Sequence, residues 1–117
     1  MISIVDDDES VREATKELIR SLGYSVAVFA SAEEFLLSAQ LSETACLISD
    51  VQMPGLSGID LQRRLIADGH KMPIIFITAF PDERTRNRAL GAGAIGFLSK
   101  PYREESLIGC LSEALKF

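Results

Sequence analysis

Two apolar runs of this sequence end in carboxylates. The run ISIV leads into Asp6, Asp7 and Asp8, and the run ACLIS leads into Asp50. Two carboxylates about 5 Å apart repel each other by roughly 3 kcal/mol at an effective dielectric constant near 20, so a cluster of them needs a counter-charge or bound protons. If the fold brings these residues together, they form a site for a cation.

Other residues of chemical interest follow two further apolar runs. Thr78 and Ala79 come directly after PIIFI, and Ser99, Lys100 and Pro101 come after AIGFL. Each is ordinary alone, since a threonine at the end of a strand is usually a loop residue and a lysine before a proline is usually solvated. Their shared position, directly after an apolar run, is what indicates a common site.

The apolar runs have the length of strands and alternate with segments of helical period, which predicts an α/β domain. Their near-continuous hydrophobicity indicates a parallel sheet buried on both faces. The carboxyl ends of such strands meet at one edge, where ligands bind. Strands are expected at residues 2–5, 24–29, 45–49, 73–77 and 94–98, and helices at about 11–22, 32–39, 58–68, 81–94 and 104–115.

Two of these helices have particular features. Ser31 and Glu34 predict a capping box at the start of the second helix. The fourth helix, within residues 81–94, carries few large apolar residues before Leu90, although most helix stability in proteins comes from an amphipathic face. It is either a solvated surface helix or a mobile, partner-facing element.

Length and composition exclude several classes of protein. A chain of 117 residues predicts one domain that spans residues 1–117, with no output domain. The net charge of -5 argues against nucleic-acid binding by this domain, because phosphate binding needs a basic face. No apolar run approaches the roughly 18 residues of a membrane span. Neither a signal peptide nor an anchor is expected, so we expect a cytoplasmic protein that contacts no membrane. Cys46 and Cys110 are interpreted as free, buried thiols of a reducing compartment.

Charge counting indicates which cation the site would hold. Asp6, Asp7 and Asp50 sum to -3 and Lys100 contributes +1, so one divalent cation brings the total to zero. Oxygen ligands with room for water favour Mg²⁺ or Mn²⁺ over zinc or copper.

Four stretches carry a resemblance to a known family. In chain order they are IVDDDESVR, LISDVQMPGLSGIDL, PIIFITAF and GAIGFLSKP, and together they resemble the receiver domain of two-component response regulators over essentially the whole chain. The resemblance implies a flavodoxin-like, doubly wound sheet of five parallel strands in the order 2-1-3-4-5, with helices on both faces. The stretch FASAEEFL also resembles the subfamily of regulators that carry a helix-turn-helix DNA-binding output domain.

By this resemblance, Asp50 matches the phosphoacceptor, whose carboxylate takes the phosphoryl group from the phosphohistidine of a sensor histidine kinase. Asp7, Asp50 and the backbone carbonyl of Gln52 match the direct Mg²⁺ ligands, while Asp6 holds the metal through water. The domain is therefore expected to be a phosphoacceptor switch that controls transcription through an output domain or a partner. It would be no enzyme beyond autophosphorylation and slow autodephosphorylation.

The resemblance also implies which residues respond to phosphorylation. Thr78 would hydrogen-bond one phosphoryl oxygen, Lys100 would pair with another, and the backbone N–H of Ala79 would donate to the same group. The Lys100–Pro101 bond is expected to be cis. Phe97 matches the switch aromatic, whose ring turns inward as Thr78 moves toward the phosphate. The face made by the fourth helix, the fifth strand and the fifth helix would change. The sequence leaves open whether this change drives a homodimer through the fourth and fifth helices or releases an inhibited partner.

Three neighbouring residues have separate expectations. Asp8 is expected to cap the first helix rather than to join the site. The bulky Phe80 is expected to shield the acyl phosphate from water. His70, in the loop before the fourth strand, is given no role.

Two other functions compete with the phosphoacceptor switch. A phosphorylation-independent, receiver-like interaction module would be favoured by the loss of Asp50 or Lys100, and both are present. A Mg-dependent phosphatase resembling the haloacid dehalogenases would need a second acid two positions after Asp50, where Gln52 stands, and a longer chain.

Overall fold

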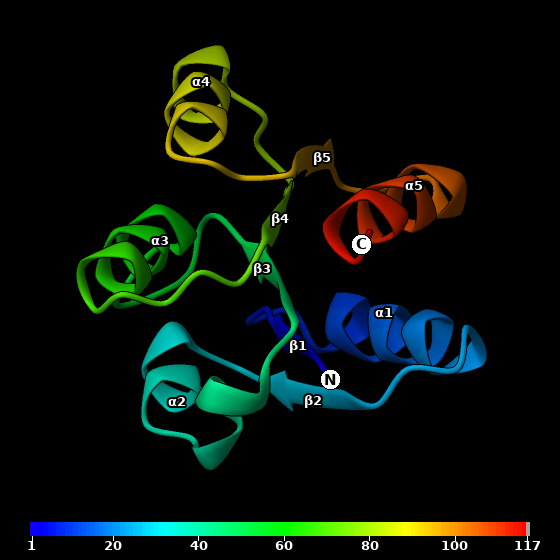
Figure 1. Ribbon diagram of the computed structural model, residues 1–117. Helices are drawn as coiled ribbons and strands as arrows, with labels where there is room; N and C mark the ends of the chain where they lie inside the picture. Colours follow the sequence, from blue (N-terminus) through cyan, green and yellow to red (C-terminus); the bar gives the residue numbers. More distant parts are fainter. Residues whose placement is uncertain (117) are drawn as a thin grey trace.

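Five parallel strands form the centre of the computed structural model, which describes residues 1–116 of the chain (Figure 1). Hydrogen bonding places the strands in the order β2-β1-β3-β4-β5. The predicted parallel sheet and its strand order are therefore confirmed. The strands are β1 (Ile2–Val5), β2 (Val26–Phe29), β3 (Cys46–Asp50), β4 (Ile74–Thr78) and β5 (Gly96–Ser99).

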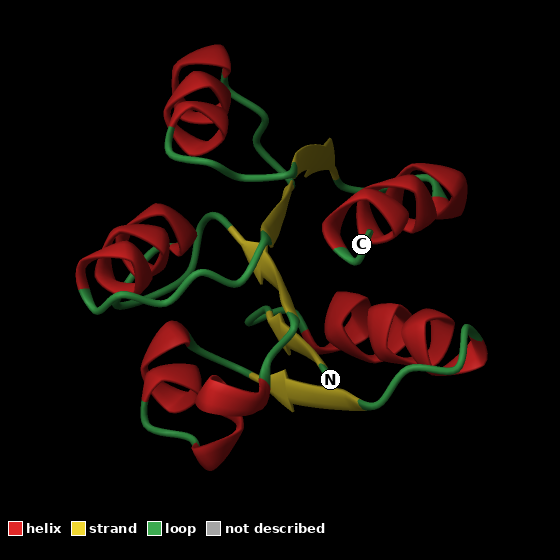
Figure 2. Ribbon diagram, in the orientation of Figure 1, coloured by secondary structure: helices red, strands yellow, loops and turns green. Residues whose placement is uncertain are grey.

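Helices cover both faces of the sheet, as the doubly wound prediction requires. Helices α1 and α5 lie on one face, and α2, α3 and α4 lie on the other (Figures 1 and 2). The helices are α1 (Glu9–Ser21), α2 (Ala32–Leu36), α3 (Gly58–Ala67), α4 (Glu83–Gly91) and α5 (Glu104–Ala114), and a short 3₁₀ helix, η1 (Ala39–Glu43), follows α2. Within residues 1–116, none of the helices combines the length and the apolarity that crossing a bilayer requires.

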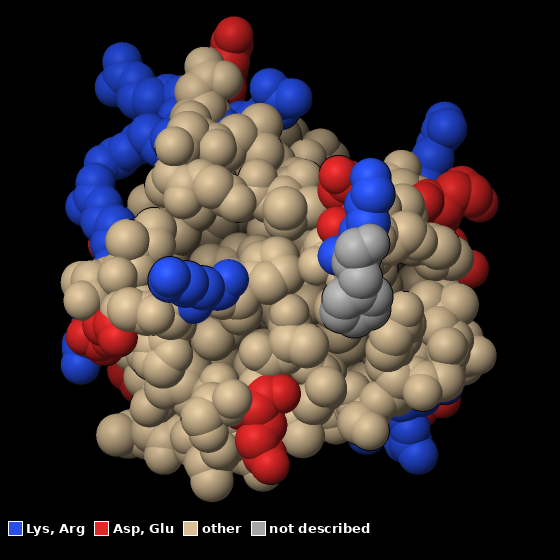
Figure 3. Space-filling model, viewed as in Figure 1, with Lys and Arg blue, Asp and Glu red and all other residues tan. Residues whose placement is uncertain are grey.

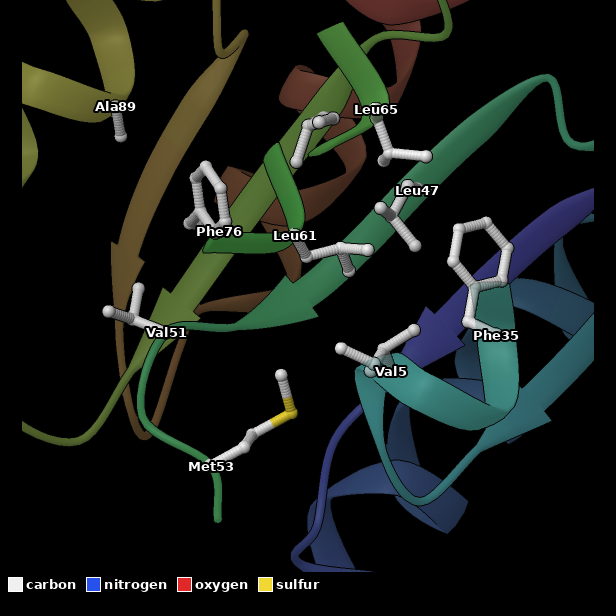
Figure 4. Close-up of a cluster of buried hydrophobic side chains, with 11 residues drawn as sticks. Val5, Phe35, Leu47, Val51, Met53, Leu61, Leu65, Phe76 and Ala89 are labelled. Atoms are coloured by element: carbon white, nitrogen blue, oxygen red, sulfur yellow. The ribbon is translucent and has the colours of Figure 1, made fainter. Parts of the chain in front are cut away.

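The hydrophobic core has two parts, one on each side of the sheet. Leu47 belongs to the cluster under α2, α3 and α4, whereas the next residue, Ile48, belongs to the cluster under α1 and α5. Figure 4 shows the first cluster, in which Leu61 lies between Phe76 and Phe35. Consecutive strand residues face opposite clusters, and both clusters are buried and apolar. The strands are therefore continuous apolar runs in the sequence.

Several predicted boundaries were wrong by a few residues. Strand β2 begins at Val26 instead of residue 24, because pairing with β1 starts at Ile2 opposite Val26. Strand β5 covers Gly96–Ser99 instead of 94–98, since its pairing with β4 starts at Gly96. Helix α2 ends at Leu36 instead of residue 39, where the Ser38 side chain accepts the Gln40 N–H and starts η1.

Two side-chain predictions also need correction. The Ser31 hydroxyl oxygen accepts the Glu34 N–H, but the Glu34 carboxylate reaches the Ser31 hydroxyl rather than the Ser31 N–H, so only half of the predicted capping box forms. A complete capping box lies instead at the start of α3, between Ser57 and Asp60. Cys46 is buried as expected, but Cys110 is only partly buried.

Candidate functional site

The strand ends bring three carboxylates together. Carboxylate oxygens of Asp6, Asp7 and Asp50 all lie within 4.8 Å of one another. Asp6 and Asp50 are buried, with 3% and 5% of their surface exposed, whereas Asp7 is exposed to solvent. The cluster is thus a shallow site, with two buried carboxylates beneath one that faces water.

Lys100 provides the positive charge of this site. Its Nζ lies 3.0 Å from Asp6 Oδ2 and 3.2 Å from Asp50 Oδ2. Burial lowers the pKa of Lys100, but hydrogen bonds and charge interactions with the two carboxylates more than offset this, so its pKa lies above the ordinary 10.5. Lys100 therefore stays protonated and bridges the strand ends of β1 and β3.

Lys100 does not fully neutralise Asp50. Burial first, and the neighbouring Asp6 carboxylate second, raise the pKa of Asp50 from 3.8 to about 6, against the opposing effect of Lys100. The negative charge of Asp50 is therefore held at an energetic cost that a further cation would relieve.

The loop between β1 and α1 is held by local hydrogen bonds. The Asp6 carboxylate accepts the Asp8 N–H at 2.9 Å, and Arg12 Nη1 donates to the Asp6 carbonyl at 2.8 Å. The Asp8 carboxylate accepts the Val11 N–H at 3.2 Å and so caps α1, as predicted. Arg12 was missed in the sequence, where its only signal is a cation one helical turn beyond Asp8.

The loop after Asp50 is held at both ends. The Gly58 N–H donates to the Val51 carbonyl at 2.7 Å, and any Cβ at Gly58 would overlap the Asp50 carbonyl oxygen. Near the loop tip, the Glu33 carboxylate accepts the Leu56 N–H at 3.1 Å. These contacts set the path of the segment that contains Gln52.

Thr78 ends β4 beside this cluster. Its side chain is fully buried, and its hydroxyl oxygen accepts the Phe80 N–H at 3.1 Å. The Lys100 N–H donates to the Thr78 carbonyl at 2.7 Å, and the Lys100–Pro101 bond is cis, as expected. The Phe80 side chain is 68% exposed, and its shielding role remains a prediction.

Phe97 lies on the α4 side of the sheet rather than at the acidic edge. Its ring is partly buried and packs at a tilt against Phe76, with 6.4 Å between the ring centroids. Helix α4 buries only Ala89, which belongs to the core cluster that Phe97 packs against. Figure 3 shows Lys and Arg side chains gathered on this side, where α4 carries Arg84, Arg86 and Arg88.

The donor set of the acidic edge fits a hard divalent cation. The cluster consists of aspartates alone, without cysteine or histidine, and the adjacent Gln52 can add a carbonyl oxygen. Oxygen donors with open solvent on the Asp7 side match Mg²⁺ or Mn²⁺. His70 lines a cavity at the opposite end of the strands, far from this chemistry.

The fold and the site together define a doubly wound α/β domain with an acidic site at the carboxyl ends of its strands. The chain belongs to the response regulator receiver domain family, whose model matches residues 2–112. As expected for that family, the fold is shared with solved receiver structures. The structure entitled "Low Resolution Structure of Response Regulator StyR" aligns with a TM-score of 0.91 and 43% identity, covering 98% of this chain and 58% of that chain.

Individual relatives agree with this assignment. The chain is 47% identical over 116 residues to the response regulator protein TodT of Pseudomonas putida, covering 99% of this chain and 51% of the relative. It is 34% identical over 115 residues to the transcriptional regulatory protein FixJ of Bradyrhizobium diazoefficiens, covering 98% of this chain and 56% of the relative. The chain therefore spans about half the length of the curated relatives it matches.

Proposed function

We propose that this domain is a phosphoacceptor switch in which Asp50 takes a phosphoryl group from a phosphohistidine of a sensor histidine kinase. The observation that carries the proposal is the convergence of three carboxylates and Lys100 at one strand edge. In the transfer, an Asp50 carboxylate oxygen forms a bond to phosphorus as the bond from phosphorus to the histidine nitrogen breaks. The imidazole leaves with the electron pair and takes up a proton from solvent.

Asp7, Asp50 and the Gln52 carbonyl would hold Mg²⁺ or Mn²⁺ directly, with Asp6 bound to it through water. When bound, the cation neutralises charge on the transferring phosphoryl group. Phosphoryl transfer asks the protein mainly for positioning and charge stabilisation. Lys100 supplies a fixed positive charge, and the small side chain of Ala79 leaves room for its backbone N–H to donate to the phosphoryl group.

Phosphorylation changes the charge that the site must accommodate. Asp50 goes from -1 to about -2, so the sum over the carboxylates, Lys100 and a divalent cation moves from zero to about -1. We infer that Lys100 turns from the carboxylates to a phosphoryl oxygen. The Thr78 hydroxyl would leave the Phe80 N–H and donate to another phosphoryl oxygen.

The movement of Thr78 would be transmitted to Phe97 and α4. The Phe97 ring would turn inward, and the face formed by α4, β5 and α5 would change its shape. Because α4 buries only Ala89, a small difference in free energy is enough to shift it. A phosphorylation-dependent homodimer through α4 and α5 is the form of output that we propose.

The wider context of the domain is part of the same proposal. Relatives named as transcriptional regulators are about twice as long as this chain, which supports a role for the domain in controlling transcription through an output domain or a partner. The domain itself would contact neither nucleic acid nor membrane and would act in the cytoplasm. Its covalent chemistry would be limited to autophosphorylation and slow autodephosphorylation.

Labelling with a small phosphodonor tests the proposal. The protein is incubated with acetyl phosphate and Mg²⁺ and analysed by intact mass. The wild type should gain one labile phosphoryl group, Asp50→Asn should gain none, and the control Asp8→Asn should label like the wild type. Equal labelling of all three would overturn the role of Asp50, and labelling of none would favour a phosphorylation-independent module. Repeated turnover of a phosphate ester would indicate a phosphatase.

Size-exclusion chromatography tests the proposed output. A beryllofluoride mimic of the phosphoryl group is added in the presence of Mg²⁺. A shift of the wild type to the dimer volume, absent in Asp50→Asn, is expected. A monomer under both conditions would contradict the homodimer.

A further inference from the structure

The segment that carries Lys100 borders two surface hollows. It runs from the end of β5 to the start of α5, and a cavity lies on each side of it. One, of about 330 Å³, lies between this segment and the first turns of α1 and is lined by Lys100, Pro101 and Tyr102. The other, of about 190 Å³, is lined by Ser99, Pro101 and Tyr102. Parts of Pro101 and Tyr102 therefore border open space rather than packed side chains.

Lys100 itself contacts Asp6, Asp50 and the Thr78 carbonyl, and a further side-chain hydrogen bond ties this segment to α1. The hydroxyl groups of Tyr102 and Thr15 lie 2.8 Å apart. Thr15 is only 1% exposed and stands on the buried side of α1, and the Tyr102 ring packs against the core cluster that contains Ile19 and Leu107. Arg103, which precedes α5, makes no side-chain capping bond. Within the described residues, the Tyr102 hydroxyl is thus the polar anchor of this segment beyond the contacts of Lys100 itself.

The Tyr102–Thr15 hydrogen bond differs from the contacts of the Lys100 ammonium in one respect. Among residues 1–116, the Lys100 ammonium bonds Asp6 and Asp50, and the second of these partners changes chemically when Asp50 is phosphorylated. The Tyr102 and Thr15 hydroxyls lie outside the acidic cluster. Their bond can hold the backbone two residues beyond Lys100 both before and after transfer.

We infer that Tyr102 is a positioning residue for Lys100 and acts through its hydrogen bond to Thr15. The inference rests on the proposed function, in which Lys100 stabilises the phosphoryl group. The hydroxyl, rather than the ring, is the part that positions. Without it, the two cavities leave room for the segment to shift, and the Lys100 head would spend less time at the transferring group.

A double-mutant cycle tests this role, because each hydroxyl can be removed without changing the size of its side chain. Tyr102→Phe, Thr15→Val and the double variant are compared with the wild type. Tyr24→Phe, at the exposed second tyrosine of the chain, is the matched control. The readouts are the rate of labelling by acetyl phosphate at saturating Mg²⁺ and, without phosphodonor or metal, the hydrogen-exchange rate of the Lys100 ammonium by NMR.

The two hydroxyls should behave as a unit. Each single variant should label about three- to tenfold more slowly and show faster exchange at Lys100, and the double variant should be no worse than either. Tyr24→Phe should match the wild type in both readouts. A purely structural role would lower the melting temperature of Tyr102→Phe and leave both readouts unchanged.

The outcomes separate this inference from the proposed function. Unchanged labelling and unchanged Lys100 exchange in Tyr102→Phe would overturn the positioning role, as would independent, multiplicative effects in the double variant. A wild type that acetyl phosphate does not label would instead overturn the proposed function. In that case the ammonium exchange still decides whether Tyr102 restrains Lys100.

Discussion

The acidic strand edge and helix α4 are held in place in opposite ways. At the edge, Asp6 and Asp50 are almost fully buried, Lys100 bridges them, and hydrogen bonds from Arg12 and Gly58 hold the flanking loops. Helix α4, by contrast, buries one small residue and leaves its arginines in solvent.

Helix α4 nevertheless has one buried polar contact. Gln62 on α3 is 2% exposed, and its Nε2 donates to the Ala89 carbonyl at 3.0 Å. The domain therefore combines a rigid site with one helix whose position depends on few interactions. A chemical change at the site can then shift α4, the element whose movement needs the least free energy.

The largest effect on stability should come from crowding the rigid region. Gly58→Ala places a Cβ against the Asp50 carbonyl oxygen and 3.0 Å from the Phe76 ring, and neither the backbone nor the core can move away easily. We expect a loss of about 3 kcal/mol in the free energy of unfolding, measured by urea denaturation. Gly109→Ala in α5, where a Cβ meets nothing within 4 Å, is the control. Equal stability of the two variants would show that the edge is more pliable than its contacts indicate.

Cation binding should distinguish two adjacent aspartates at the rigid edge. Asp7→Ala removes a carboxylate of the cluster and should weaken Mg²⁺ binding at least about tenfold, as measured by titration calorimetry. Asp8→Ala removes the cap of α1, so it should cost about 1 kcal/mol of stability and leave Mg²⁺ binding nearly unchanged. Similar losses of Mg²⁺ affinity in both variants would show that the two residues do not divide these roles.

Acidic pH should relieve the charge strain at Asp50. The folded protein holds the Asp50 proton up to about pH 6, against an ordinary pKa of 3.8. The contribution of this carboxyl to stability is therefore full below about pH 4 and is lost as the pH rises through 6. In EDTA at pH 7.5, the free energy of unfolding of Asp50→Asn should exceed that of the wild type by about 1–3 kcal/mol. The loss of the ion pair with Lys100 in this variant subtracts from that gain.

That stability difference should shrink as the pH falls toward 4. Denaturation midpoints of both proteins across this range provide the measurement. A difference that does not change with pH would mean that Asp50 titrates alike in the folded and unfolded states.

Removing the buried contact of α4 should loosen that helix alone. In Gln62→Leu, the Ala89 carbonyl still accepts the Ala94 N–H at 3.0 Å, so no buried acceptor is orphaned and the cost should be about 1 kcal/mol. Amide hydrogen exchange should accelerate in α4 and remain unchanged in β1 and β3. Gln40→Leu in η1 serves as control, and uniform acceleration over the domain would argue against a separately held helix.

The smallest effect should have the opposite sign. Gly91 lies in the last turn of α4 with nothing within 4 Å of a Cβ, so Gly91→Ala reduces the freedom of the unfolded chain without a clash. We expect thermal denaturation to show a gain of about 0.5 kcal/mol. A loss of stability would mean that α4 is packed more closely than its exposure suggests.

Much of this arrangement was predictable because local patterns report burial. The apolar runs before Asp6, Asp50 and Thr78 predicted strands, and the topology of parallel sheets then placed their carboxyl ends at one edge. The few apolar residues of the fourth helix likewise predicted its exposure. Boundaries were less accurate: β2 starts at Val26 because pairing with β1 sets its first residue, and Tyr24 before it is as apolar as a strand residue.

The amino-acid sequence by itself determined the class of domain, the edge at which the charged residues gather and the net charge that calls for a divalent cation. Periodicity and residue type encode these directly, since burial and charge are properties of each residue. Only the tertiary structure decided which distant side chains meet. Gln62 on Ala89 and Tyr102 on Thr15 each join elements far apart in the chain, and such pairings depend on helix packing that no local pattern records.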